Sequence, residues 1–356
     1  MTEVVVCCGV GGTGKTTTAA ALGVAAALAG RRAVVLTIDP ARRLADALGL
    51  ASLPNQATEV SVPGAEGTLH ALMLDRKGTW DAVIRRFAAT PDDATRLLDN
   101  RYYRAVSTRL TGSHEYMAIE KLYELVHTDR WDLVIVDTPP ARHVLDFFRA
   151  PDRVARLLDR SVLGVLTEPG RGLLGGATRA AIGVGERVAG DAVMSDIADF
   201  FRLFQGLSSG FRARAAATSR LLRSPRTRYY LVTHASAPER NDILGFLATL
   251  RGEGMQFAGF LVNRTAQRVE VDERDLPDAV AGVDAATWSQ WRTALRALPS
   301  TRRRRREAHL TAARKLVDAA GGSPAWLVPE LDQSPRDVKS LAQLARFLPP
   351  NPPSTF

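Results

Sequence analysis

The glycine-rich stretch at residues 9–17 constrains this chain more than any other feature. It reads Gly-Val-Gly-Gly-Thr-Gly-Lys-Thr-Thr and matches the phosphate-loop pattern G-x-x-x-x-G-K-[ST] at every fixed position. Residues 4–8 before it form an apolar run typical of a buried strand, and the alanine-rich residues 17–29 after it have high helix propensity. The sequence therefore predicts a strand, a phosphate-binding loop and a helix in succession.

Such a loop binds phosphate oxygens through inward-facing backbone N–H groups and through the partial positive charge of the helix N-terminus. The Lys15 ammonium is expected to contact the β- and γ-phosphates of a nucleotide, and the Thr16 hydroxyl to ligate Mg²⁺. The predicted nucleotide-binding residues of this stretch are Gly11, Gly12, Thr13, Gly14, Lys15, Thr16 and Thr17. The alternative is a turn without a ligand, and four glycines in register with Lys-Thr argue against it.

Composition indicates a globular chain with a sizeable core. The 356 residues are 46% hydrophobic, enough for one large domain or two smaller ones. No apolar run approaches the length of a membrane span and no secretory signal is recognisable, so we expect a cytoplasmic protein. The two cysteines, Cys7 and Cys8, are adjacent on a predicted strand and point to opposite faces, which favours core filling over a redox or metal role.

The chain is basic, with a net charge of +9, and this charge admits anionic partners such as nucleic acid, acidic lipid or an acidic protein. The densest cationic run is Arg302–Arg306, which Glu307 and a helical pattern follow. The start of a solvated helix is the favoured interpretation of that run, and an anion-binding patch is the alternative. Because no aromatic residues are interleaved with it for base stacking, nucleic acid is not the expected partner, although peripheral membrane contact stays open.

Strand and helix patterns alternate along the chain as they do in a doubly wound, mostly parallel α/β sheet flanked by helices. A second strand, 33–38, ends at Asp39, which is placed to orient or deprotonate an attacking water. The same Asp-Pro pair also fits the start of a helix, so both interpretations stand. A later strand ends at Asp137, where a carboxylate beside a phosphate loop holds the water shell of Mg²⁺. Further strands are expected at 68–74, 229–233 and 255–262, with helices at 239–250 and 338–348.

Three motifs together resemble one family of ATPases. They are Gly-Gly-x-Gly-Lys-Thr-Thr at 11–17, Asp-Pro-Ala-x-x-Leu-x-Asp at 39–46 and Asp-Thr-x-Pro-x-x-His at 137–143. They look like the phosphate loop, switch I and switch II of the arsenite-pump and tail-anchored-protein-targeting ATPases, which group with the MinD, ParA and nitrogenase iron-protein ATPases. The resemblance implies a P-loop fold, ATP and Mg²⁺ as cofactors, and a dimer that switches its binding of a protein client.

The resemblance also implies roles for single residues. Asp39 takes the water-activating role and Asp137 the Mg²⁺ role. Asn263, in Phe-Leu-Val-Asn at 260–263, is similar to the strand-end asparagine that reads adenine. Pro329, in Leu-Val-Pro at 327–329, is similar to a later loop that closes over the base.

One departure concerns catalysis. The family carries a signature lysine in its phosphate loop that reaches the phosphates of the other subunit, and Val10 stands at that position here. Charge that develops on the γ-phosphoryl oxygens needs a cation. Three alternatives follow: hydrolysis is slow, Arg42 or Arg142 replaces the lysine, or a related subunit supplies it. Arginines in surface ion pairs are the simpler interpretation of both residues. Metal chemistry also departs, since Cys7 and Cys8 cannot build the thiolate sites of the metalloid- or zinc-binding members.

The chain is expected to form a single P-loop ATPase domain over residues 1–356, with three special regions. Residues 150–225 are predicted to be a glycine-rich, helical client or partner subregion whose apolar stripe is either core or a binding surface. Residues 264–322 are predicted to be an arginine-rich helical insertion, and 349–356 a flexible tail.

Three functions remain open at this point. The first is a Mg²⁺-dependent ATPase whose dimer closes on ATP and regulates a protein client, as a homodimer or as a heterodimer with a lysine-bearing relative. The second is a nucleotide-binding, catalytically weak regulatory subunit, and the third is a nucleoid-associated partitioning ATPase. The client itself cannot be read from the sequence.

Overall fold

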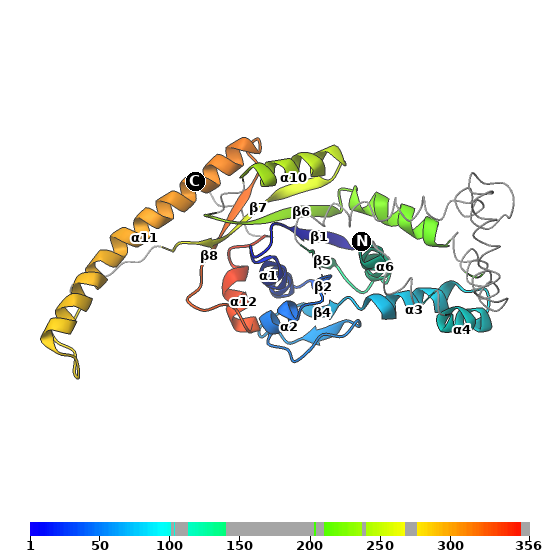
Figure 1. Cartoon of the computed structure of the whole chain (residues 1–356), viewed down its shortest axis with the longest axis horizontal. Helices are drawn as coiled ribbons and strands as arrows, with labels where there is room; N and C mark the ends of the chain where they lie inside the picture. The colour runs from blue at the N-terminus through cyan, green and yellow to red at the C-terminus, as the bar shows by residue number, and fades with distance from the viewer. Residues whose placement is uncertain are drawn as a thin grey trace, which may run out of the picture.

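The computed structural model describes residues 1–100, 103, 113–139, 203, 210–236, 240–267 and 276–349. In these residues the chain builds an eight-stranded sheet of order β3-β4-β2-β5-β1-β6-β7-β8 (Figure 1). Every neighbouring pair is parallel except β3 and β4, which run antiparallel. The strands are β1 Glu3–Cys8, β2 Arg32–Thr37, β3 Thr58–Val60, β4 Thr68–Met73, β5 Leu133–Asp137, β6 Thr227–His234, β7 Gln256–Thr265 and β8 Ala325–Pro329.

Helices cover both faces of the sheet, as Figure 1 shows. One face packs against α3 Arg76–Phe87, α6 Ser113–Val126, α10 Arg240–Gly252 and α11 Ala285–Ala319, while α4 Pro91–Asp99 lies beside α3. The other face packs against α1 Lys15–Leu28, α2 Arg43–Leu48 and α12 Val338–Ala345. The expected doubly wound α/β fold is therefore confirmed.

The central strands are apolar throughout because both of their faces are buried. In β1, Cys8 packs into the core on the α6 side and Cys7 into the core on the α1 side, and both are fully buried. Burial raises the pKa of both thiols, which keeps them neutral. The two cysteines fill the core from opposite sides of one strand, as the sequence predicts.

Two elements differ from the sequence interpretation. Residues 327–329, interpreted as a loop, belong to β8, whose apolar residues pair in parallel with β7. The short antiparallel β3 was not predicted, because three residues carry too little periodicity to identify a strand. Strand β7 also continues to Thr265, so the first residues of the expected 264–322 insertion belong to the sheet.

The arginine-rich region contains one 35-residue helix, α11, which begins with Asp284 accepting a hydrogen bond from the Thr287 backbone N–H at 2.9 Å. Its last turns pack on the sheet, and its first half extends past the sheet (Figure 1). Within the arginine run, Arg305 pairs with Glu330 at 3.0 Å and Arg303 lies 3.9 Å from Glu307. The run is part of a solvated, charged helix, but it lies inside α11 and not at a helix start as the sequence suggested.

Of the predicted 150–225 subregion, the structure describes only position 203 and residues 210–225, and 210–222 are helical. Phe211, from the apolar stripe, is core there, with its ring 5.6 Å from Tyr116 and 5.8 Å from Trp80. The predicted tail after position 349 lies outside the described residues. No helix in the described ranges combines the length and the hydropathy that crossing a membrane requires.

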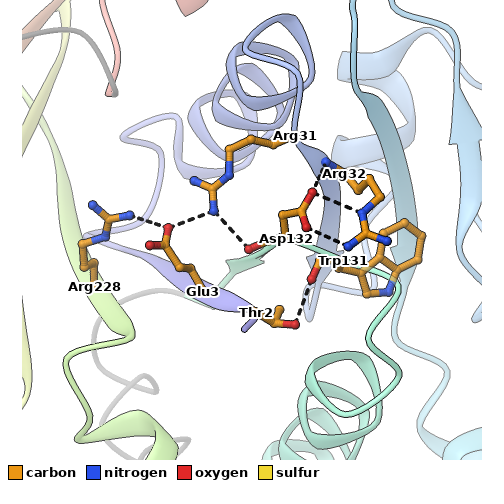
Figure 2. Close-up of polar contacts among 7 residues, drawn as sticks. All are labelled: Thr2, Glu3, Arg31, Arg32, Trp131, Asp132 and Arg228. Atoms are coloured by element: carbon orange, nitrogen blue, oxygen red, sulfur yellow. Dashed lines mark hydrogen bonds and ion pairs between the residues drawn. The ribbon is translucent and has the colours of Figure 1, made fainter.

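The amino-terminal ends of the central strands are tied by ion pairs (Figure 2). Glu3 of β1 pairs with Arg31 at 2.9 Å and with Arg228 of β6 at 2.8 Å. Asp132, just before β5, accepts hydrogen bonds from the Arg32 guanidinium at 2.7 and 3.2 Å and from its backbone N–H at 2.9 Å. Hydrogen bonds and charge from Arg32 lower the pKa of Asp132 to about 2. Ion pairs therefore join the amino ends of these strands. A ligand site is expected at their carboxyl ends.

Candidate nucleotide-binding site

The loop between β1 and α1 curls at glycines whose backbone other residues adopt rarely. Gly14 has φ 89° and caps the N-terminus of α1, and Gly9 has φ 152°. A Cβ on Gly14 would lie 2.2 Å from Asn263 Nδ2, and one on Gly9 would lie 2.2 Å from the Val232 carbonyl oxygen. The glycines are therefore required both by backbone conformation and by the close approach of β6 and β7.

A cavity of about 340 Å³ opens at the carboxyl ends of the strands, where ligands of doubly wound sheets bind. Residues from the loop, from the β2–α2 connection, from the end of β5 and from the loop after β8 line it. They are Gly11, Gly12, Gly14, Lys15, Thr16, Thr17, Asp39, Arg43, Asp46, Ala47, Thr138, Ser334, Pro335 and Arg336. The structure thus brings most of the predicted phosphate-loop residues together with Asp39.

Asp137 ends β5 behind this cavity and is completely buried. Its Oδ2 accepts a hydrogen bond from the Thr37 hydroxyl at 2.9 Å, while its Oδ1 is buried and has no hydrogen-bond partner among the described residues. Burial raises the pKa of Asp137 to about 6, against the opposing effects of Thr16, Thr37 and Lys15. An unpaired buried carboxylate oxygen with the Thr16 side chain close by fits the oxygen ligands that Mg²⁺ requires.

Lys15 lies within the curled loop, with its Nζ donating to the Val10 carbonyl oxygen at 3.0 Å. The Thr13 hydroxyl donates to the same oxygen at 2.9 Å. Burial lowers the pKa of Lys15, and the nearby Asp137 carboxylate acts in the opposite direction. The ammonium therefore sits in the cavity wall, held by the loop's own backbone.

Asp39 does not start a helix, because α2 begins at Arg43 with Arg42 as its N-cap, and the water-activating role of Asp39 stays a prediction. Its Oδ1 accepts a hydrogen bond from the Ala41 N–H at 2.9 Å, which shapes the turn into α2. Its Oδ2 forms an ion pair with Arg43 Nη1 at 3.0 Å, and the side chain is 22% exposed. The residue is a turn former that also faces the cavity.

The two adjacent arginines at the start of α2 point in different directions. Arg42, predicted as a charge-stabilising residue, donates from Nη2 to the Ala51 carbonyl oxygen and is not among the cavity-lining residues. Arg43, which the sequence interpretation missed, lines the cavity instead. Its place close after Asp39, in the segment that follows the second strand, is the signal that could have found it. Arg142, the other predicted cation, lies outside the described residues.

Two strand-end side chains hold the phosphate loop from behind. Asn263 Nδ2 donates to the Thr13 carbonyl oxygen at 2.9 Å, and His234 Nε2 lies 3.0 Å from the Gly12 carbonyl oxygen. His234 and Asn263 are neighbours across β6 and β7, so the pair contacts two consecutive loop carbonyls. Asn263 Oδ1 also accepts the Arg264 N–H at 2.9 Å. His234 is a second site residue that the sequence interpretation missed.

The two residues assigned to adenine lie apart from the cavity wall. Neither Asn263 nor Pro329 is among its lining residues. Pro329 is buried at the end of β8 beside Thr265, and the following loop supplies Ser334, Pro335 and Arg336 to the cavity instead. The adenine assignment of both residues stays a prediction.

A parallel sheet with a strand, a G-x-x-x-x-G-K-T loop and a helix around an open cavity defines a P-loop nucleotide-binding protein. The family profile described as anion-transporting ATPase matches residues 2–181. The chain therefore belongs to this family.

Curated relatives match parts of the chain at low identity. An uncharacterized protein of Streptomyces coelicolor is 34% identical over 157 residues, which are 43% of this chain and 38% of that protein. ATPase ASNA1 homolog 1 of Paramecium tetraurelia is 30% identical over 158 residues, covering 43% and 45% of the two chains. ATPase get3 of Aspergillus terreus is 26% identical over 151 residues, covering 42% and 43%. In each comparison the chain spans less than half of the relative's length.

Proposed function

We propose that this protein binds MgATP in the cavity between the phosphate loop and α2 and hydrolyses its γ-phosphate. The observation that carries the proposal is the convergence of Lys15, Thr16 and Asp39 on one cavity, with the unpaired Asp137 oxygen behind it. Family membership supports the same activity.

Each of these residues has a distinct role in the proposal, according to its chemistry. Backbone N–H groups of the loop and the N-terminus of α1 bind the phosphate oxygens, and Lys15 exchanges the Val10 carbonyl for the β- and γ-phosphates. Thr16 and Asp137 would hold Mg²⁺, which neutralises part of the triphosphate charge when bound. Asp39 orients the attacking water, because it is the carboxylate that faces the cavity from the end of β2.

A conformational role is the second part of the proposal. We propose that ATP closes a dimer, either of two copies or of this chain with a relative that carries the signature lysine, and that closure alters binding of a protein client. Because Val10 stands at the lysine position, a mixed dimer would receive the lysine from the relative, and a dimer of two copies would need another cation in its place. The cytoplasmic location expected from the sequence also stays a prediction.

Val10 in place of the signature lysine also favours one competing function, a regulatory subunit that binds ATP but hydrolyses it very slowly. Phosphate release and ATP binding, measured on the same preparation, separate the two. The ATPase predicts binding and turnover in the wild type, loss of binding in Lys15→Ala, and retained binding with lost turnover in Asp39→Asn. Binding with background turnover, raised only by a lysine-bearing partner, would establish the regulatory subunit, and no binding at all would refute both.

A further inference from the structure

Charge that develops on the γ-phosphoryl oxygens of a bound triphosphate needs a cation, and Arg43 has the position to be one. It is the first residue of α2, and it lines the cavity beside Lys15, Thr16 and Asp39. Its guanidinium pairs with Asp39 Oδ2 at 3.0 Å. If Asp39 orients the attacking water as proposed, a cation at this distance from it would lie next to the reacting γ-phosphate.

The Arg43 side chain is also free to change partners. It is 68% exposed, and an exposed ion pair contributes little stability, so exchanging Asp39 for a phosphate oxygen costs little. A guanidinium suits that exchange, because its fork of N–H donors matches phosphate geometry and it stays charged at any working pH. Arg43 can therefore leave Asp39 as an anionic group enters the cavity.

The electrostatics of the cavity agree with this placement. Burial is the main cause that lowers the pKa of Lys15, and the positive charge of Arg43 adds to it. Lys15 and Arg43 thus both place positive charge at the cavity, and each raises the affinity of the cavity for a polyanion. Arg42, bonded to the Ala51 carbonyl, is directed elsewhere.

We infer that Arg43 replaces the absent signature lysine from within the same chain by stabilising the charge on the γ-phosphoryl oxygens during hydrolysis. In that step a water oxygen bonds to the γ-phosphorus while the bond to the β,γ-bridging oxygen breaks. ADP leaves with that oxygen, and the water proton passes to phosphate or to Asp39. Arg43 takes no proton and acts only on the charge. This inference rests on the proposed ATPase function.

Arg336 is the competing cation, because the loop after β8 also brings it to the cavity wall. Arg336 and Arg43 differ in the residues that they contact. The backbone of Arg336 approaches Gly49 at the far end of α2, whereas Arg43 pairs with Asp39. We therefore expect Arg336 to affect nucleotide affinity and Arg43 to affect the chemical step.

The test measures kcat, KM and the Kd of a non-hydrolysable ATP analogue for Arg43→Ala, Arg43→Lys, Arg42→Ala and Arg336→Ala. Because arginine fingers contribute about 10³- to 10⁵-fold in rate, Arg43→Ala should lower kcat by about 100-fold or more, with Kd changed by less than about fivefold. Arg43→Lys should recover part of the rate, since it keeps the charge and loses the fork. The kcat of Arg42→Ala should exceed that of Arg43→Ala by at least about 20-fold, on the same scale.

A second readout does not depend on turnover. ADP with aluminium fluoride mimics the transferring phosphoryl group, so it should bind wild type more tightly than ADP alone, and Arg43→Ala should lose this difference. The inference is overturned if Arg43→Ala retains kcat within about threefold, if its loss is in Kd alone, or if Arg336→Ala carries the kcat loss instead. If the wild type binds no nucleotide, the proposed function fails, which is a distinct result.

Discussion

Asp137 carries the proposed magnesium role at the scale of a single residue, and its environment gives that proposal a test. A fully buried carboxylate with an unpaired oxygen is costly unless something else compensates it. Burial raises its pKa from 3.8 to about 6, so the folded protein holds a proton here more tightly than the unfolded chain does. The stability associated with this proton is present below pH 4 and is lost as the pH rises through about 6.

Asp137→Asn should remove that pH dependence. We expect the variant without nucleotide to have a higher Tm than the wild type at pH 7, with a smaller gap at pH 4.5, because a neutral amide avoids the buried charge. It should also lose the extra Tm that Mg²⁺ adds to ATP-bound wild type. A variant that still responds to Mg²⁺ would place the metal on other residues.

Gly14 makes the second prediction at this scale. Gly14→Ala puts a methyl group 2.2 Å from Asn263 Nδ2 at a φ of 89°, so it should destabilise the fold by about 1–3 kcal/mol and abolish ATP binding. Gly245→Ala is the matched control, because α10 leaves open space there and alanine is the better helix former by about 1 kcal/mol. Urea unfolding and calorimetry measure both effects. Normal ATP binding by the Gly14 variant would contradict the loop geometry.

At the scale of elements, the ends of β6 and β7 support the phosphate loop. The His234 and Asn263 side chains contact the Gly12 and Thr13 carbonyls from behind, so the two strands fix the loop against the sheet. Both functional atoms of the Asn263 amide are used, one by Thr13 and one by Arg264. A positioning role therefore competes with the adenine role that the family resemblance implies.

Nucleotide selectivity decides between these roles. If Asn263 positions the loop, Asn263→Ala should weaken ATP and GTP by the same factor, about tenfold for one lost buried hydrogen bond. His234→Ala should act in the same way and serves as the comparison. A selective loss of ATP affinity in Asn263→Ala, with GTP unchanged, would instead assign adenine recognition to this residue.

Local patterns explain which elements the sequence could predict. Short contiguous motifs predict the apolar strands, the glycine loop, Asp39 and Asp137. Residues 327–329 were interpreted as a loop, since a five-residue edge strand such as β8 is identified by its pairing with β7 rather than by its own pattern. Arg43, His234 and the 334–336 loop were missed because their roles arise only where distant segments meet.

At the scale of the whole molecule, the proposed site and the ion pairs lie at opposite ends of the strands. The carboxyl ends open into the cavity, and the amino ends carry the ion pairs of Glu3 and Asp132 (Figure 2). Because the pKa of Asp132 is lowered to about 2, its contribution to stability is present above about pH 4 and is lost as the pH falls toward 2. We therefore expect that loss of an ion pair at the amino ends leaves the cavity at the carboxyl ends unaltered.

Asp132→Asn tests that separation. The variant should have a lower free energy of unfolding than the wild type at pH 7, and the difference should vanish near pH 2, where the wild-type carboxylate takes up a proton. ATP affinity at pH 7 should match that of the wild type. A change in ATP affinity would show that the two ends of the strands are coupled. A stability difference that persists at pH 2 would show that the Arg32–Asp132 pair acts through packing.

The central claim is that MgATP occupies the cavity formed by the phosphate loop, α2 and the end of β5. A crystal structure with Mg²⁺ and a non-hydrolysable ATP analogue tests it most directly. The account predicts triphosphate density against the loop N–H groups and Lys15, with the metal between Thr16 and Asp137. Density elsewhere, or an empty loop at saturating nucleotide, would contradict it.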